Sequence, residues 1–458
     1  SFIGGDGDGD GCGGGDGIPT AAPMGSGMSP FDSNLFAVEV LENYIWNVGD
    51  DGVEVRDSGR TRVANNEIGK VGLATSDTQA PVWLNGWERG ANDGDGVHIR
   101  NVYADRSDPQ STRLIGSMGN SVEVLGNRID RSADDGVEVH YSGRTLVAEN
   151  NITNSGAGFR HPYGGGGDEG YGHDAIHVGG VHDDDSYYGP TNSVVIRDNI
   201  IDTTGDDGVE VHFAGRTLII DNTITHAGYG GGYSYGGGDE DGADAINVMN
   251  IKSNDNNAPF SVDIRRNTID VTEDDGIEVA YASRTRIRNN DLTNIGQDFD
   301  PYYRPNSINS IYGADGIHVR NIRQSSEYPR RADVRIINNR VTNADDDGIE
   351  SLNTNRVVVK RNTVDQTGDD GISILRNESF AMNSLRGMVQ SVRLRSAPSK
   401  AVIEGNVVTN AGTPFPEETD DPVISLFNFI GSPGGDGIQV DGFDEIKVID
   451  NDVSNSVE

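Results

Sequence analysis

One short pattern recurs along the chain and places titratable side chains at a fixed position. It consists of two acids, a glycine and alternating aliphatic residues, as in residues 206–211, which read Asp-Asp-Gly-Val-Glu-Val. The residue between the two aliphatic positions changes from copy to copy, in the order Glu54, His98, Glu138, His177, Glu210, Asn247, Glu278, His318 and Glu350. If the copies stack, carboxylates and imidazoles become neighbours that could act as general acid and base. The alternation would also prevent repulsion within a column of glutamates, so a purely structural role stays open.

Titratable residues are densest in the middle of this series. His140 and His212 each stand two positions after a Glu, where other copies have an arginine. If the protein has a catalytic site, we expect it to be formed by Asp135, Glu138, His140, Asp174, His177, Asp207, Glu210 and His212.

An aspartate also occupies a fixed position in the copies, just before the glycine or an alanine that replaces it. The aspartates are Asp51, Asp95, Asp135, Asp174, Asp207, Asp244, Asp275, Asp315, Asp347, Asp370 and Asp436. Like charges cannot stack closely without partners, so each carboxylate must accept backbone N–H bonds or share a calcium ion. The acids that precede this column, Asp134 and Asp206 among them, add oxygens that favour a metal at some copies.

Residues 1–30 are mostly Gly, Asp, Ser and Pro, which is typical of a flexible leader. Asp6, Asp8 and Asp10 have the spacing of a calcium-binding loop. Gly17 stands where such a loop would have its bidentate Glu, so a plain linker is the alternative. Calcium is therefore the cofactor that the sequence suggests.

The elements that must position these side chains are short strands, because a column of asparagines recurs with the same period. The asparagines are Asn43, Asn66, Asn127, Asn151, Asn199, Asn222, Asn267, Asn290, Asn339, Asn362, Asn406 and Asn451. Short, β-branched strands bounded by Gly, Asn and Asp cannot bury a face alone and must stack. We therefore predict an all-β solenoid over residues 31–458, a single domain of about 11–12 coils.

Long insertions interrupt alternate coils of the predicted solenoid, and they are rich in Gly and Tyr. Insertions that recur at one position of a solenoid lie on one face, often the binding face. Tyrosines suit sugar rings, which need a flat apolar face with polar edges. The candidate substrate-binding residues are Tyr163, Tyr171, Tyr229 and Tyr235. Ordinary loop composition is an equal alternative.

The composition limits the partners. A formal net charge of −37 over 458 residues excludes a nucleic-acid-binding protein and argues against docking on an anionic membrane. No apolar run is long enough for a membrane span. Cys12 is the single cysteine, so no intrachain disulfide can form. Such acidity suits high salt, calcium binding or an extracellular surface, with an acidic cytosolic protein as the alternative.

The asparagine, Asp-Gly and aliphatic columns together resemble the right-handed parallel β-helix of the pectate-lyase-like superfamily, over about residues 33–458. Residues 313–318 and 368–373 are similar to two motifs of polygalacturonases, although here an extra coil containing Asp347 separates them. The resemblance implies a polysaccharide substrate, and lyases and epimerases of the superfamily use calcium.

Two functions follow as expectations. The first is an extracellular or cell-surface protein that binds a polysaccharide along the insert-bearing face and cleaves or epimerises it, with calcium. The second is a non-catalytic extracellular fibre or adhesin, because open solenoid ends present unpaired strand edges that favour head-to-tail self-association.

Overall fold

The structure is a computed structural model that describes residues 37–56, 58, 60–72, 94–100, 121–140, 142–156, 174–179, 193–212, 214–228, 243–249, 261–296, 314–320, 332–376, 399–412 and 436–456. The described residues form short β-strands joined by turns, and none of them belongs to a helix that could cross a membrane. The chain divides into two compact units, unit 1 (residues 1–247) and unit 2 (residues 248–458). The predicted leader, residues 1–30, lies outside the described residues, and the assignment of residues 31–458 to one domain stays a prediction.

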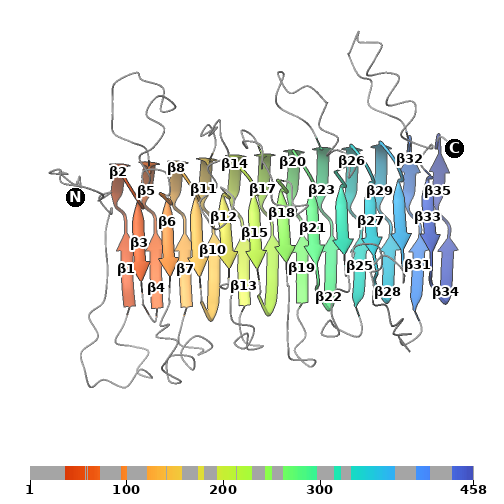
Figure 1. Ribbon diagram of the computed structural model, residues 1–458, viewed down its shortest axis with the longest axis horizontal. Helices are drawn as coiled ribbons and strands as arrows, with labels where there is room; N and C mark the ends of the chain where they lie inside the picture. The colour runs from red at the N-terminus through yellow and green to blue at the C-terminus, as the bar shows by residue number, and fades with distance from the viewer. Residues whose placement is uncertain are drawn as a thin grey trace, which may run out of the picture. The chain divides into compact units, whose positions relative to one another are not determined.

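Unit 1 contains three parallel sheets, in which each strand pairs with the strand three places later in the sequence (Figure 1). The first sheet has the order β1 (Ala37–Leu41), β4 (Arg60–Ala64), β7 (Ser121–Leu125), β10 (Arg144–Ala148), β13 (Ser193–Arg197), β16 (Arg216–Ile220). The second has the order β2 (Tyr44–Val48), β5 (Glu67–Val71), β8 (Arg128–Ser132), β11 (Asn151–Ser155), β14 (Ile200–Thr204), β17 (Thr223–Ala227). The third has the order β3 (Val53–Arg56), β6 (Val97–Arg100), β9 (Val137–His140), β12 (Ile176–Gly179), β15 (Val209–His212). The next strand, β18 (Ile246–Met249), spans the division between the units.

Unit 2 repeats the same arrangement. Its first sheet has the order β19 (Ser261–Arg265), β22 (Arg284–Arg288), β25 (Asp333–Ile337), β28 (Arg356–Lys360), β31 (Lys400–Glu404), β34 (Glu445–Ile449). Its second has the order β20 (Thr268–Thr272), β23 (Asp291–Ile295), β26 (Arg340–Ala344), β29 (Thr363–Thr367), β32 (Val407–Thr409), β35 (Asp452–Ser454). Its third has the order β21 (Ile277–Ala280), β24 (Ile317–Arg320), β27 (Ile349–Leu352), β30 (Ile372–Leu375), β33 (Ile438–Asp441).

Three successive strands, one from each sheet, make one coil of a parallel β-helix. The first two sheets of each unit have six strands in the described part of the chain, which confirms the predicted all-β solenoid and agrees with about 11–12 coils. The predicted alternation of insertions is also confirmed in unit 1. Only a short turn, residues 133–136, joins β8 to β9, whereas residues 156–175 separate β11 from β12. The candidate binding residues Tyr163, Tyr171, Tyr229 and Tyr235 lie outside the described residues.

Period-two alternation places the aliphatic residues of the third sheet in the core. Val137, Ile176 and Val209 pair in register on neighbouring strands, and all three are fully buried. The next residue on each strand, including Glu138 and His177, therefore points out of the core.

Buried asparagines hold the corner between the first and second sheets. The carboxamide oxygen of Asn150 accepts bonds from the backbone N–H (2.9 Å) and the side-chain amide (3.0 Å) of Asn127 in the preceding coil. The side chain of Asn150 donates in turn to Asn199 of the next coil at 3.0 Å. Asn151, which was predicted to belong to this column, does not, so that prediction is wrong. Asn151 is the exposed first residue of β11, and its neighbour Asn150 is buried.

Candidate functional site

Three adjacent strands of the third sheet of unit 1 bring the predicted site residues together. In register, His177 on β12 pairs with Glu138 on β9 and with Glu210 on β15. His140 and His212 are the last residues of β9 and β15. We call Glu138, His140, His177, Glu210 and His212 the Glu/His cluster. The remaining predicted residues, Asp135, Asp174 and Asp207, lie in the turns just before these strands.

The three aspartates cap backbone groups of the following coils. Oδ1 of Asp135 accepts the backbone N–H of Asp174 at 2.8 Å, and Oδ1 of Asp174 accepts that of Asp207 at 3.0 Å. Oδ1 of Asp207 accepts the N–H of Asp244 at 2.6 Å. Backbone capping, one of the two explanations offered for this column, is thus observed, with the bond made to the next coil.

His98, His177 and His318 each lie close to one aspartate and one glutamate. His177 lies with Nδ1 3.5 Å from Oδ2 of Asp135 and Nε2 3.4 Å from Oε2 of Glu210. His98, one repeat earlier, lies with Nδ1 3.2 Å from Asp51 and Nε2 3.0 Å from Glu138. In unit 2, His318 is held in the same way, at 3.0 Å from Asp275 and 3.1 Å from Glu350. This arrangement belongs to the repeat, as the structural explanation of the alternation requires.

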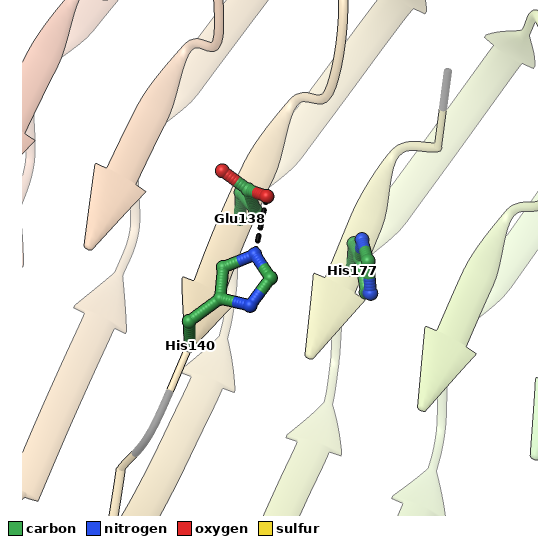
Figure 2. Close-up of side chains that lie close together, drawn as sticks. All are labelled: Glu138, His140 and His177. Atoms are coloured by element: carbon green, nitrogen blue, oxygen red, sulfur yellow. Dashed lines mark hydrogen bonds and ion pairs between the residues drawn. The ribbon is translucent and has the colours of Figure 1, made fainter. Parts of the chain in front are cut away.

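His140 and His212 depart from the repeat. Nε2 of His140 bonds to Glu138 on the same strand, and Nε2 of His212 lies 2.6 Å from Oε1 of Glu210 (Figure 2 shows the first pair beside His177). The ring centroids of His140 and His177 are 5.4 Å apart, and those of His177 and His212 are 5.8 Å apart. Three imidazoles therefore lie in succession across three strands.

At the corresponding position, other copies have Arg56, Arg100 and Arg320, and two copies that carry a Glu have Ala280 and Leu352. Arg56 forms an ion pair with Glu54 on β3, and Arg320 forms one with Glu278. A histidine at this position can replace the arginine as a counter-ion, and it can also exchange a proton, which an arginine cannot.

Gly179 makes room for the cluster, and the sequence analysis missed it. It pairs in register with His140 and lies on the strand between His140 and His212. A β-carbon at residue 179 would lie 2.8 Å from Nε2 of His177, so any side chain there would push the imidazole aside. Gly179 stands two residues after His177, which is the position that His140 and His212 occupy after a Glu. This correspondence in the sequence could have identified Gly179.

Solvent reaches most of the cluster. The side chains of Glu138 and His140 are 19% and 17% exposed, and those of Glu210 and His212 are 13% exposed. His177 is only 3% exposed and lies at the buried side of the cluster.

The environment separates the pKa values of the neighbouring imidazoles. Burial lowers the pKa of His177, but the charge of Glu210 and the hydrogen bond to Asp135 outweigh it and raise the pKa to about 10. Burial lowers the pKa of His140, the hydrogen bond and charge of Glu138 oppose this, and the charges of His177 and His98 lower it further, so the pKa lies below its usual value. A cationic and a neutral imidazole therefore lie side by side at neutral pH.

The pKa values of the neighbouring carboxyl groups also differ, being lowered in the glutamates and raised in two of the aspartates. Burial raises the pKa of Glu138 and of Glu210, but the bonds and charges of the neighbouring histidines outweigh it and hold both well below the usual range. Burial, with the charge of Glu210, raises the pKa of Asp174 well above its usual value. Burial raises the pKa of Asp135 to about 7, although the hydrogen bond with His177 opposes this.

Some of these groups are close enough to hold a cation. Donor atoms of Glu138, His140 and His177 lie within 4.8 Å of one another, as do those of His177, Glu210 and His212. Such mixed nitrogen and oxygen sets suit transition metals, whereas calcium takes oxygen ligands. Asp134 and Asp206, predicted as metal ligands, precede the capping aspartates in the turns before β9 and β15. Asp6, Asp8 and Asp10 lie outside the described residues.

The two segments that resemble polygalacturonase motifs lie on different strands of unit 2. Residues 313–318 lead into β24 and residues 368–373 lead into β30, and β27 lies between them in the sheet. The extra coil expected from the sequence is therefore present.

Comparisons with solved structures give remote matches. A double mutant of the periplasmic alginate epimerase AlgG matches with a TM-score of 0.44 and 10% identity, over 92% of this chain and 74% of that chain. The catalytic unit of a GH87 alpha-1,3-glucanase from Streptomyces thermodiastaticus matches with a TM-score of 0.37 and 14% identity, over 92% of this chain and 64% of that chain. No match was found among curated proteins.

The comparison with protein families covers nearly the whole chain. The family described as "Right handed beta helix region" matches residues 32–248 and again residues 250–457. This confirms the handedness and the fold that the three sequence columns predicted. The chain belongs to the right-handed β-helix family.

Proposed function

We propose that the chain is an extracellular or cell-surface protein that binds an acidic polysaccharide and modifies it by proton transfer at the Glu/His cluster, as a lyase or an epimerase. The observation that carries this proposal is the pair of histidines, His140 and His212, that lie on either side of His177 at a position where no other copy has a histidine. Charge neutralisation within the fold needs only a cation such as arginine, whereas an imidazole can also accept and donate a proton.

Removal of the proton next to a uronate carboxylate needs a base and a positive charge close together. His140, oriented by Glu138, supplies a base on the exposed side of the cluster. His177, held between Asp135 and Glu210, supplies the positive charge. Hydrolysis is supported less well, because it needs two carboxyl groups free to act on the glycosidic bond, and Glu138 and Glu210 are each paired with histidine.

The strand at the centre of the cluster also carries insertions at both ends. Residues 156–175 precede β12 and residues 180–192 follow it, and they include the candidate sugar-binding Tyr163 and Tyr171. A polyuronate would meet a strongly acidic protein, so we include calcium in the proposal, as an ion that bridges the two through carboxylates such as Asp134 and Asp206.

The test is product analysis by mass spectrometry after incubation with acidic and neutral polysaccharides, with and without calcium. We expect unsaturated or epimerised products from an acidic polysaccharide. The His140→Arg, His212→Arg double variant introduces the arginine that stands two residues after Glu54, and it should keep a partner for Glu138 and Glu210 while losing turnover. His226→Arg is the matched control, since His226 pairs with Asp202 on the second sheet and is 45% exposed. Full turnover in the double variant would contradict the site.

A second function, a non-catalytic fibre or adhesin, is favoured by the evenness of the repeat, since the same ladders of aspartates and asparagines recur in both units. Val448 on β34 is 54% exposed, whereas Ile403, its partner in register on β31, is fully buried. Either a further coil or a second copy stacked head to tail would cover Val448. A strict monomer in sedimentation at high concentration would count against it, and so would an unchanged sedimentation coefficient for Val448→Lys if the wild type associates.

A further inference from the structure

One column of outward residues on the second sheet consists mainly of Asp and Thr. Across β8, β11, β14 and β17 one column reads Asp130, Thr153, Asp202 and Thr225. Each Thr hydroxyl donates to the Asp of the preceding strand, at 3.2 Å from Thr153 and 2.8 Å from Thr225. In unit 2, Thr293 donates to Asp270 at 2.8 Å in the same way.

At the first two strands of unit 1 the same column has a tryptophan and a glycine. Trp46 on β2 pairs in register with Gly69 on β5, and Gly69 pairs with Asp130. A β-carbon at Gly69 would lie 2.2 Å from Cζ3 and 2.8 Å from Cη2 of Trp46. The indole therefore lies directly on the backbone of β5, in the space that an Asp or Thr of the pattern would fill.

Tyr44 extends this aromatic surface along β2. Its ring is nearly parallel to that of Trp46, with an interplanar angle of 9° and centroids 5.7 Å apart. Tyr44 is 41% exposed, and Ile45, between the two aromatic residues, is buried in the core. Both rings therefore lie on the outer side of the sheet. We call Tyr44 and Trp46, with Gly69 beneath the indole, the aromatic platform.

Hydrogen-bonding groups border the aromatic platform. Glu67 pairs in register with Tyr44, and Arg128 lies 3.5 Å from its carboxylate, with the two side chains 46% and 67% exposed. Asp130, next to Gly69 in its column, lies 3.8 Å from Arg131. A sugar ring has a complementary surface, with C–H groups on its faces and hydroxyl groups around its edge.

We propose that the aromatic platform binds a pyranose ring of a polysaccharide chain by stacking, at a site separate from the Glu/His cluster. The aromatic platform is on the second sheet and the cluster is on the third sheet, in later coils. One exposed ring and one half-buried ring are too small a surface for a stable protein partner, and both lie outside the core. The proposal extends the proposed function, but it concerns affinity, which is measured independently of turnover.

The test is affinity electrophoresis in gels that contain soluble polysaccharides, followed by titration calorimetry with oligosaccharides of the best ligand. We expect Trp46→Ala and Tyr44→Ala each to weaken binding about tenfold or more. Gly69→Thr should do the same, because it restores a residue of the pattern and displaces the indole without removing it. Ile200→Ala is the matched control, since Ile200 is a 54% exposed apolar residue in the column of Tyr44.

Equal binding by the wild type and the three platform variants, or no binding of any polysaccharide, would overturn the proposal. Thermal unfolding of each variant separates lost binding from lost folding, and Gly69→Thr, which retains both rings, separates ring position from ring removal. The two proposals can fail independently. If Trp46→Ala keeps both turnover and the affinity of the wild type, only the aromatic platform is contradicted. If the wild type and the His140→Arg, His212→Arg variant both bind the polysaccharide and neither turns it over, only the catalytic site is contradicted.

Discussion

At the scale of single residues, the difference between His140 and an arginine at its position concerns proton exchange. Arg56 is a fixed cation beside Glu54 on its own strand, whereas His140, with its lowered pKa, bonds to Glu138 as a neutral imidazole at neutral pH. A guanidinium stays protonated at all accessible pH values, whereas an imidazole can give up and accept a proton near neutrality. Replacement of histidine by arginine therefore tests the chemistry and leaves the architecture of the repeat in place, which an alanine would not do.

Gly179 gives a second test of the Glu/His cluster. In Gly179→Ala the new β-carbon would lie 2.8 Å from Nε2 of His177, so the ring must turn away from Glu210. We expect a loss of stability of about 1 kcal/mol and a larger proportional loss of turnover, because a displaced charge no longer faces the substrate. Imidazole ¹⁵N chemical shifts would report the movement of His177. Unchanged shifts and unchanged turnover would show that the space beside Gly179 has no role.

A pH dependence follows from Glu350 in unit 2. Burial raises its pKa from 4.5 to about 7, against the charge of His318 and with the charges of Asp275, Asp346 and Asp370. The folded state therefore binds the proton more tightly than the unfolded state does. This contribution to stability is fully present below pH 4.5 and is lost as the pH rises to about 7.

Denaturant unfolding at several pH values between 4.5 and 7.5 would measure this contribution. The free energy of unfolding of the wild type should fall by roughly 1–3 kcal/mol more than that of Glu350→Gln over this range. Glutamine keeps the size and hydrogen-bonding capacity of a protonated glutamate. Parallel curves for the two proteins would refute the assignment.

At the scale of the element, the coil is defined by its corner. Each buried asparagine of the ladder follows a residue with positive φ, for example Asn65 (56°), Gly126 (62°) and Glu149 (60°). The chain turns there from the first sheet to the second, and the next residue's side chain then points inward to bond with its neighbours. Which residue occupies the left-handed position decides which asparagine is buried.

This explains why the columns were predictable and one position was not. Repetition alone identified the aliphatic, Asp-Gly and asparagine columns, because the same packing problem recurs in every coil. Residues 150 and 151 are both asparagine, however, and only the corner geometry distinguishes Asn150, which is buried, from Asn151, which begins the strand. Trp46 and Gly69 were missed for a related reason, since their contact joins two coils and neither residue belongs to the pattern.

The two asparagines provide a matched pair of variants. Asn150 makes four hydrogen bonds through its side chain, two from Asn127, one to the carbonyl of Val124 and one to Asn199. Asn150→Ala should therefore lower the free energy of unfolding by about 2–4 kcal/mol, because it leaves buried backbone groups without partners. Asn151→Ala should change it by less than about 0.5 kcal/mol. Denaturant unfolding of the two variants compares them directly, and equal effects would refute the assignment of the ladder.

At the scale of the whole molecule, charge is the dominant quantity. A formal net charge of −37 opposes the folded state by self-repulsion, and the stacked aspartates concentrate part of that charge in one column. The fold offsets this locally in two ways. Backbone N–H groups bond to the aspartates, and burial raises the pKa of Asp95, Asp174 and Asp315 well above the usual range, which favours their uncharged form.

Calcium, which the sequence predicts to bind at carboxylates such as Asp134 and Asp206, should stabilise the protein more than sodium at matched ionic strength. Binding to the folded state alone adds about 2.7 kcal/mol when the free ion is at 100 times its dissociation constant, which corresponds to a rise of a few degrees in Tm for a chain of this size. Thermal unfolding is measured at matched ionic strength in calcium, in magnesium, and in sodium with EGTA. Magnesium is the control for charge, because it demands a more regular geometry than calcium. The Asp134→Asn, Asp206→Asn double variant should lose most of the calcium-specific rise and keep the response to sodium. Equal stabilisation by calcium, magnesium and sodium would show that the salts only screen the acidic surface. That result would contradict the role of calcium in the proposed function. The catalytic role of the Glu/His cluster would still be tested by the His140→Arg, His212→Arg variant.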